Sequence, residues 1–243
     1  MTDLYSTSII RNIYKRPSNK SEVTSQIIYG ERIRILELKN KWLKIKTFND
    51  NYPGFIKNKN LKKELKIIFK TYKLKTRVFS QNKRKNFLTF NSRLPVVTKG
   101  KKFIEFEKGK WVKKKDLKPK NYKEKNFVKI LKPFINCKYT WGGKSYKGID
   151  CSALIQLYYL YNNKFFPRDT KDQMSFRKSK KKKIKYSKGD IIYWKGHVAI
   201  CLDKKKLIHA YGPRKKVLIM NIKKTIELIN KTAKLKVKKI IRI

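Results

Sequence analysis

The chain has 243 residues, of which 40% are hydrophobic and 13% aromatic, so it can bury real cores and disorder is not expected. Its 66 basic and 16 acidic residues give a formal net charge of +50. No apolar run approaches the roughly 18 residues that cross a bilayer, and the N-terminus lacks the apolar core of a signal peptide. We therefore expect a soluble, cytoplasmic protein without a membrane helix.

Lysine supplies most of this charge, with 55 Lys against 11 Arg spread over the whole chain. The densest run, Lys178 to Lys185, is expected to be a solvated loop. Such a field attracts polyanions in a salt-dependent way. Proteins that read bases use Arg and interleaved aromatic residues, and neither pattern stands out here. We attribute the charge to the drift of an AT-rich coding genome and expect no nucleic-acid partner. A selected affinity for a polyanion is the alternative.

Two N-terminal regions carry short apolar segments divided by turn residues, as in small β-barrels. In residues 1–62 the expected strands are 9–14, 26–28, 33–38, 42–46 and 52–56. In residues 63–120 the pattern is less clear, with expected strands at 77–80, 87–90, 95–98, 103–106 and 110–113. A linker near 118–121 leads to a third region, 121–243, which opens with apolar residues at helical spacing from Phe127 to Phe134.

The stretch around Cys151 organises the third region. Residues 142–148 contain three of the ten glycines in the chain, and glycine permits sharp turns and close backbone approach. After Cys151 the apolar residues recur at helical spacing up to the neighbourhood of Pro167. We therefore predict that Cys151 lies in the first turn of an amphipathic helix and that Asp150 caps it.

This position has chemical consequences for the thiol. Unpaired amide groups at a helix N-terminus favour negative charge, so a thiol there ionises more readily. The carboxylate of Asp150 opposes this, so a cationic neighbour such as a histidine is needed. A small, buried, apolar cysteine on a core helix is the alternative interpretation.

The chain has two histidines, His197 and His209, and both follow the predicted Cys151 helix. Short strands and turns are predicted around them, so their separation of twelve residues suits a hairpin. An odd-length turn centred on Asp203 would set the imidazoles opposite each other, and an even-length turn would separate them unless a bulge intervened. The candidate roles are Cys151 as nucleophile, His197 as base and His209 as the group that orients the base. Two satisfied core histidines are the alternative.

Five ordered segments, YTWGG, IDCSALIQLYY, PRDT, KGDIIYWKGHVAI and LIHA, resemble the NlpC/P60 family of cell-wall peptide hydrolases. This resemblance covers the C-terminal half of the chain and implies an α+β, papain-like catalytic domain. It implies that Cys151, His197 and His209 form the triad. It also implies that Tyr139 lies close to the nucleophile and that Asp150 and Ser152 line the substrate cleft. One departure from the family pattern is an alanine at position 153, where glycine is usual, and a helix tolerates this well.

Residues 30–61 resemble a bacterial SH3 domain, with an unrelated small barrel as the alternative, and residues 63–120 suggest a second, degenerate copy. Two SH3-like domains before an NlpC/P60 domain resemble peptidases that cut the γ-D-glutamyl–diamino acid bond of murein peptides with a free N-terminal L-alanine. In those enzymes the first SH3-like domain covers one end of the cleft. The resemblance therefore implies a small murein peptide as substrate and a role in cell-wall peptide recycling or turnover.

A buried substrate ammonium needs carboxylate partners. Asp150 is the first candidate, and the resemblance adds Glu22 and Tyr52 of the first barrel, for which ordinary surface turn residues are the alternative. Arg168 is expected to face a substrate carboxylate or to pair with an aspartate in the segment 169–172.

Other functions compete with this one. The chain could be a wall- or polyanion-binding protein with an inactive peptidase domain, or an amidase or acyltransferase on the same fold. A zinc site of Cys151, His197 and His209 is possible by ligand type, but its spacing is unlike common motifs. Three distant cysteines without a C-x-x-C pair support neither a disulfide framework nor a structural zinc site, so we expect no metal and no cofactor.

Overall fold

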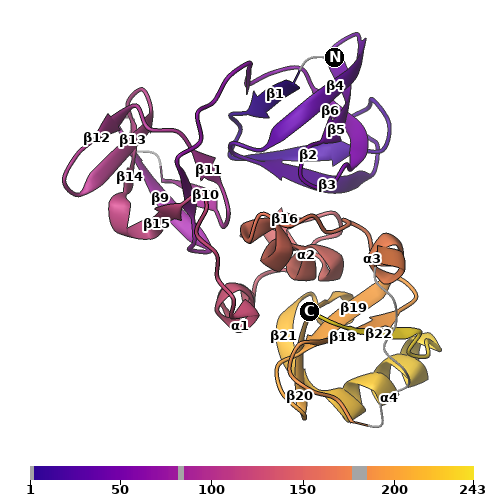
Figure 1. The fold of residues 1–243 in the computed structure, drawn as a ribbon. Helices are drawn as coiled ribbons and strands as arrows, with labels where there is room; N and C mark the ends of the chain where they lie inside the picture. Colours follow the sequence, from indigo (N-terminus) through magenta and orange to yellow (C-terminus); the bar gives the residue numbers. More distant parts are fainter. Residues whose placement is uncertain (1–2, 82–84, 177–184) are drawn as a thin grey trace.

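The computed structural model describes residues 3–81, 85–176 and 185–243, so the predicted lysine-rich loop lies almost entirely outside the described residues. Figure 1 shows three units in chain order. The first unit contains β1–β7, the second unit contains β8–β15, and the C-terminal unit runs from α1 to β22. We propose 1–62, 63–120 and 121–243 as the corresponding domain limits.

The first unit is one antiparallel sheet with the strand order β3-β2-β6-β5-β4-β1-β7. Its strands are β1 (Asp3–Ser6), β2 (Ile10–Tyr14), β3 (Val23–Ile28), β4 (Arg32–Lys39), β5 (Trp42–Thr47), β6 (Pro53–Lys57) and β7 (Leu61–Lys62). Alternate residues point to the two faces of a strand, and isoleucine and leucine from β2 to β6 fill the core on one face. All five strands expected from the sequence are present. The expected small barrel is not closed, however, because β3 and β7 are the two edges of the described sheet and closure requires the edges to pair.

The second unit is built from two smaller sheets, with the orders β10-β9-β14-β13-β12 and β11-β8-β15. Its strands are β8 (Phe69–Thr71), β9 (Lys75–Ser80), β10 (Asn86–Thr89), β11 (Arg93–Leu94), β12 (Thr98–Lys99), β13 (Phe103–Glu107), β14 (Lys110–Lys113) and β15 (Leu117–Pro119). The expected strand at 95–98 is largely absent. Pro95 lacks a backbone N–H and so ends β11 at Leu94.

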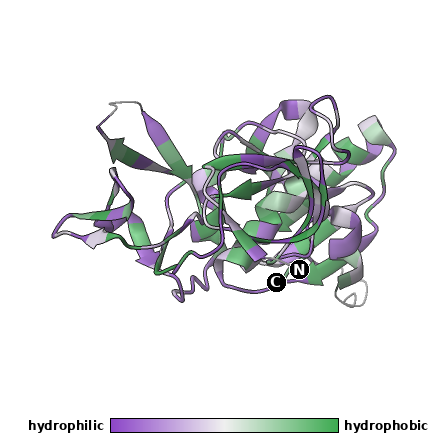
Figure 2. Cartoon of the chain, turned by 90° about the horizontal axis from the view of Figure 1, so that it is seen from above, coloured by the Kyte–Doolittle hydropathy of each residue, from purple (hydrophilic) through white to green (hydrophobic). Residues whose placement is uncertain are grey.

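The C-terminal unit sandwiches an antiparallel sheet, of order β21-β20-β19-β18-β22, between helices. Its helices are α1 (Phe127–Leu131), α2 (Cys151–Tyr161), α3 (Thr170–Phe176) and α4 (Ile222–Ala233). Its strands are the short pair β16 (Lys144–Ser145) and β17 (Gly148–Ile149), followed by β18 (Asp190–Trp194), β19 (His197–Cys201), β20 (Lys206–Tyr211), β21 (Lys216–Asn221) and β22 (Lys239–Arg242). Along β19, Val198 and Ile200 pack with α2, while Ala199 and Cys201 pack with α4 on the other face. Both faces of this strand are therefore apolar, whereas strands elsewhere in the chain carry hydrophobic and hydrophilic residues in alternation (Figure 2).

Helix α2 begins at Cys151, as predicted, and Asp150 caps it by accepting the N–H of Ala153 at 2.8 Å. It ends at Tyr161, earlier than expected, because Asn163 adopts a left-handed conformation with φ 55°. The helix is not amphipathic, since all its residues except Tyr158 are buried.

The first unit covers α2 from the side away from the sheet, which explains this burial. Gln156 of α2 donates to Asp50 of the first unit at 2.8 Å. Lys144, just before α2, forms a buried ion pair with Glu31 at 2.9 Å. The first unit and the C-terminal unit therefore share buried polar contacts. Within the described part of the chain, no helix has the length and apolar character needed to cross a membrane.

Candidate active site

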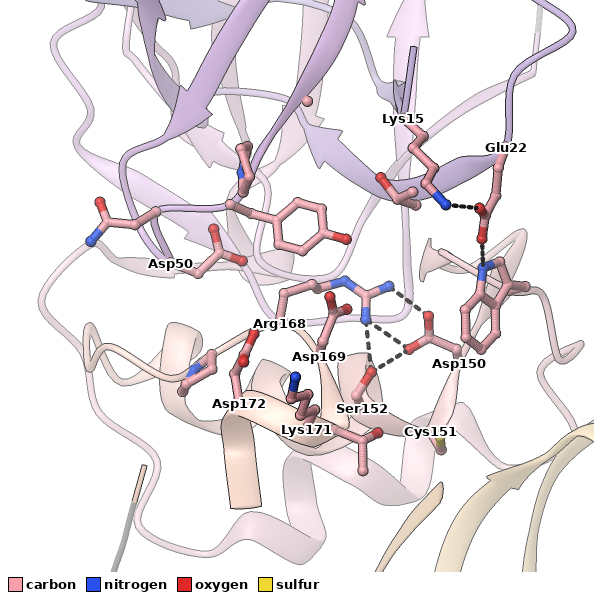
Figure 3. A pocket seen from close by; sticks show the side chains of 18 of the residues that line it. Lys15, Glu22, Asp50, Asp150, Cys151, Ser152, Arg168, Asp169, Lys171 and Asp172 are labelled. Carbon is pink, nitrogen blue, oxygen red and sulfur yellow. Dashed lines mark hydrogen bonds and ion pairs between the residues drawn. The ribbon is translucent and has the colours of Figure 1, made fainter. Parts of the chain in front are cut away.

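A cleft of about 870 Å³ lies between the first unit and the C-terminal unit (Figure 3). The first unit contributes Glu22, Asp50 and Tyr52 to its lining. The C-terminal unit contributes Trp141, the start of α2 and most residues from Phe165 to Asp172. Cys151 lies at its margin, next to the C-terminal sheet.

The Cys151 thiol lies against the first residues of β19. Its Sγ is 4.0 Å from the carbonyl oxygen of Gly196, and the N–H of Val198 donates toward it. These are the residues on either side of His197. The helix start and the strand start therefore bring the thiol next to the backbone on both sides of His197.

The two imidazoles are hydrogen-bonded to each other, with His197 Nε2 2.9 Å from His209 Nδ1. The ladder pairs Ile200 with Ile208 and Cys201 with Leu207, which centres the turn on residue 204. His209 therefore falls diagonally opposite His197 on the same face of the sheet. The turn therefore has an odd length, which is one of the two predicted alternatives. Its centre lies one residue after the predicted centre, Asp203.

This geometry bears on both nitrogens of His197. Nε2 is engaged by His209, so Nδ1 is the ring nitrogen that is available to act as a base. It also argues against a zinc site, because ring nitrogens that face each other at 2.9 Å do not both point at a third atom.

Burial decides the resting charge of these groups. Burial, followed by the Asp150 charge, raises the pKa of Cys151 to about 12, although nearby N–H groups and Arg168 oppose the shift. Burial lowers the pKa of His197 to about 4. It also lowers the pKa of His209 to about 3, with a further contribution from the His197 ring. This direction opposes the expected ease of ionisation, because desolvation outweighs the effect of the helix N-terminus.

Asp150 is at the centre of a buried polar network. Its Oδ1 accepts from Ala153 N–H and the Ser152 hydroxyl, and its Oδ2 accepts from Gly142 N–H at 3.0 Å. Arg168 donates to both oxygens, at 3.0 and 2.6 Å. The hydrogen-bonding positions of the carboxylate are thus all occupied by protein groups. Asp150 therefore stabilises the start of α2 and has no free position for a substrate group. The Ser152 hydroxyl belongs to the same network, because it also accepts from Arg168 at 2.8 Å.

Arg168 does not occupy either of its expected places. Its side chain is 1% exposed and pairs with Asp150, while Nε donates to Ser25 of the first unit at 2.9 Å. Burial alone would lower the pKa of this guanidinium, but the Asp150 charge raises it above the usual value. Neither a substrate carboxylate nor the segment 169–172 is its main partner, because the bidentate pair with Asp150 uses its planar fork.

Tyr139 lies near the thiol. Burial, followed by the charges of Cys151 and Asp150, raises the pKa of its hydroxyl, which therefore stays protonated at neutral pH. A protonated phenol beside the thiol is available as a hydrogen-bond donor.

The two candidates from the first unit line the same cleft. Glu22 accepts a hydrogen bond from the indole N–H of Trp141 at 2.9 Å and pairs with Lys15 at 3.4 Å. Burial, followed by the charge of Asp169, raises the pKa of Tyr52 to about 12. Tyr52 therefore presents a protonated hydroxyl next to a carboxylate.

Two cleft residues, Trp141 and Asp50, were not singled out from the sequence. Two others, Asp169 and Asp172, were considered only as partners of Arg168. With Glu22 and Asp150, the cleft holds five of the 16 acidic residues of the chain. The available signal was the rarity of carboxylates in so basic a chain. In such a basic chain, a single carboxylate is better evidence of a specific role than a single lysine is.

Comparisons with known proteins identify two domains in the chain. The sequence profile of the NlpC/P60 family matches residues 136–232, and the profile of the bacterial dipeptidyl-peptidase SH3 domain matches residues 13–61. Dipeptidyl-peptidase 6 of Lysinibacillus sphaericus is 26% identical over 233 residues, which cover 84% of this chain and 85% of that protein.

Solved structures show the same fold. An NlpC/P60 family protein from Bacillus cereus superposes with a TM-score of 0.78 at 18% identity, covering 91% of this chain and 94% of that one. An NlpC/P60 endopeptidase from Photobacterium damselae subsp. piscicida superposes with a TM-score of 0.66 at 13% identity, covering 98% of this chain and 70% of that one.

The fold, together with a thiol at a helix start next to the strand that carries one of two bonded imidazoles, defines a cysteine peptidase of the papain-like class. More narrowly, residues 136–232 form an NlpC/P60 domain, and residues 13–61 form a bacterial dipeptidyl-peptidase SH3 domain before it.

Proposed function

We propose that this peptidase hydrolyses the γ-D-glutamyl–diamino acid bond of murein peptides that carry a free N-terminal L-alanine, in cell-wall peptide recycling or turnover. The observation that carries the proposal is the position of the first unit, which contributes Glu22, Asp50 and Tyr52 to the cleft that contains Cys151. A cleft bounded in this way accommodates the short end of a peptide and excludes a continuous wall polymer. The relative named dipeptidyl-peptidase supports the same interpretation. A cytoplasmic location stays a prediction.

The acidic residues of the cleft support recognition of a free amine. Because the hydrogen-bonding positions of Asp150 are already occupied, Asp169, Tyr52 and Glu22 are the better partners for the substrate ammonium. Burial raises the pKa of Asp169 although the Arg168 charge opposes this, so the carboxylate is incompletely compensated by its neighbours. An incoming ammonium would supply the missing counter-charge.

The proposed mechanism starts from a neutral thiol and a neutral imidazole. As Sγ of Cys151 attacks the γ-glutamyl carbonyl carbon, Nδ1 of His197 takes the thiol proton, and His209 orients the ring. The carbonyl oxygen becomes an oxyanion that accepts from the Cys151 backbone N–H and the Tyr139 hydroxyl. The C–N bond then breaks, and His197 protonates the leaving amine to give a thioester. Water, deprotonated by His197, cleaves the thioester and releases the dipeptide and the free thiol.

The nucleophile is tested with the substrate L-Ala-γ-D-Glu-diaminopimelate. Replacing Cys151 with Ala should abolish turnover and leave thermal unfolding close to that of the unmodified protein, because the side chain is small. Release of the diamino acid is followed by chromatography. Retained turnover by a folded Cys151→Ala protein would refute the nucleophile assignment.

Recognition of the free amine is tested with the same peptide acetylated at its N-terminus. Loss of the positive charge should lower kcat/KM by at least about 100-fold, because Asp169 and Glu22 are then left without the counter-charge of the substrate. Equal turnover of both peptides would contradict the proposed specificity. Cleavage of intact sacculi, or transfer of an acyl group to an amine, would point instead to a wall hydrolase or an acyltransferase.

A further inference from the structure

The second ring nitrogen of His209 faces the side chain of Met220. His209 is fully buried, and its Nε2 lies 3.3 Å from the thioether sulfur of Met220 on the neighbouring strand β21. In the antiparallel register Leu207 pairs with Met220 and His209 pairs with Leu218, so Met220 reaches the ring diagonally. One face of the ring is stacked on Tyr211, with a centroid distance of 4.8 Å and an interplanar angle of 12°.

This contact determines which nitrogen of His209 carries the proton. A thioether sulfur has no hydrogen to donate and acts only as a weak acceptor. A ring nitrogen at 3.3 Å from it is therefore stable as N–H and not as a bare lone pair. A neutral imidazole has one N–H, so protonation at Nε2 leaves Nδ1 of His209 as an acceptor.

The protonated nitrogen of His209 also determines which nitrogen of His197 carries the proton. Since Nδ1 of His209 accepts, Nε2 of His197 must donate across the 2.9 Å contact. The neutral ring of His197 then carries its lone pair on Nδ1, the nitrogen left for the thiol. This is the tautomer that can take a proton from Cys151. The opposite tautomer would place an N–H there, which cannot act as a base.

We propose that Met220 is a positioning residue that acts through His209, its sulfur fixing the tautomers of both histidines so that His197 presents a basic Nδ1 to Cys151. This inference rests on the proposed function in its assignment of His197 as the base. The sulfur contributes through its lone pairs, and not only through its volume. The side chain is partly buried among the residues that pack against α4, so a packing role is the competing explanation.

The test compares two replacements of similar size. Met220→Leu keeps the apolar volume and removes the acceptor, whereas Met220→Gln loses apolar character and supplies an amide oxygen at a similar reach. We expect Leu to lower kcat by about threefold to tenfold with little change in KM, the worth of one neutral hydrogen bond. Gln should restore kcat to within about twofold of the unmodified protein. A packing role predicts the reverse order, and that result, or equal activity of all three proteins, would overturn the proposal.

A second readout does not depend on activity. The chain has only two histidines, so nitrogen-15 NMR of labelled protein resolves both imidazoles without further mutation. We expect both neutral rings to be protonated on Nε2 in the unmodified protein and in Met220→Gln. In Met220→Leu a measurable fraction should move to Nδ1. Protonation of His209 on Nδ1 in the unmodified protein would refute the proposal.

The two readouts separate this proposal from the function on which it rests. If the Cys151→Ala protein stays active, the catalytic assignment fails, but the NMR tautomers still report on Met220. Met174 provides the matched control, because it is a partly buried methionine packed on the other core of the same unit. Met174→Leu should change neither kcat nor the imidazole spectrum. If it reproduces the effects of Met220→Leu, those effects are general consequences of methionine loss and the proposal is refuted.

Discussion

At the scale of single residues, desolvation governs the chemistry of the site. A helix N-terminus lowers the pKa of an exposed thiol, yet Cys151 is 3% exposed and has Asp150 beside it. The thiol and the His197 imidazole are therefore both neutral at rest. The proton moves only when substrate arrives, since a developing charge on the carbonyl oxygen then receives hydrogen bonds from its surroundings.

The pH dependence of the enzyme follows from this resting state. His197 acts as a base only when neutral, and its pKa is lowered to about 4, so kcat/KM should fall on the acid side near pH 4 and not near the ordinary histidine value of about 6.5. Iodoacetamide should label Cys151 slowly at neutral pH and faster as pH rises, because its pKa is raised to about 12.

Mass spectrometry of digested protein distinguishes Cys151 from the buried Cys137 and Cys201. Rapid labelling of Cys151 at pH 6, with an acid limb near pH 6.5, would instead demonstrate a preformed thiolate–imidazolium pair.

At the scale of elements, the loop before α2 determines how the first unit closes the cleft. Gly142 has a positive φ of 70°, and its N–H donates to Asp150. A Cβ at this position would lie 2.5 Å from the carbonyl oxygen of Val23 in β3. Only glycine allows this loop and this strand to approach so closely.

Gly142→Ala should therefore weaken the contact between the first unit and the C-terminal unit. Gly109→Ala is the matched control, because Gly109 has a φ of 71° and a Cβ there would meet no atom within 4 Å. Both variants share the strain of a left-handed alanine, about 1–2 kcal/mol, and only Gly142→Ala adds a clash with backbone. We expect at least a tenfold loss of kcat/KM in Gly142→Ala and none in Gly109→Ala. The Tm of Gly142→Ala should also be lower than that of Gly109→Ala. Matching values for the two variants would show that the contact with Val23 is unimportant.

At the scale of the whole molecule, charge is distributed unevenly. The net charge is +50, yet five of the 16 acidic residues line one cleft. The positive field attracts an anionic peptide from a distance, while the carboxylates in the cleft favour its ammonium end. The two effects act at different ranges, because exposed charges are screened beyond a Debye length of about 10 Å at 0.1 M salt.

The proposed tripeptide carries more carboxylates than ammonium groups. Raising the salt concentration from about 0.05 M to about 0.5 M should therefore lower kcat/KM several-fold and leave kcat almost unchanged, since screening weakens encounter and not the buried chemistry. Steady-state kinetics over a salt series measures this. A peptide with amidated carboxylates should show a smaller slope. A kcat/KM that is independent of salt would assign the lysine excess no part in substrate capture.

Local sequence was sufficient for the elements that local interactions specify. The start of α2 follows from Asp150 and the residues after it, because capping and helical periodicity act within one or two turns. The five expected strands of the first unit follow from alternation and turn residues in the same way. The NlpC/P60 assignment was also available, since it depends on ordered segments and not on contacts.

The tertiary structure alone decided the properties that depend on distant partners. The chain order left open whether the two histidines share a face, and a turn centred one residue from Asp203 settled it. Arg168 pairs with Asp150, which lies 18 residues earlier in the chain, and Met220 of β21 contacts His209 of β20. The neutral resting state of Cys151 likewise depends on burial beneath other elements. The burial of a residue and the contacts that it makes depend on the whole folded chain, so they cannot be read from a single stretch of sequence.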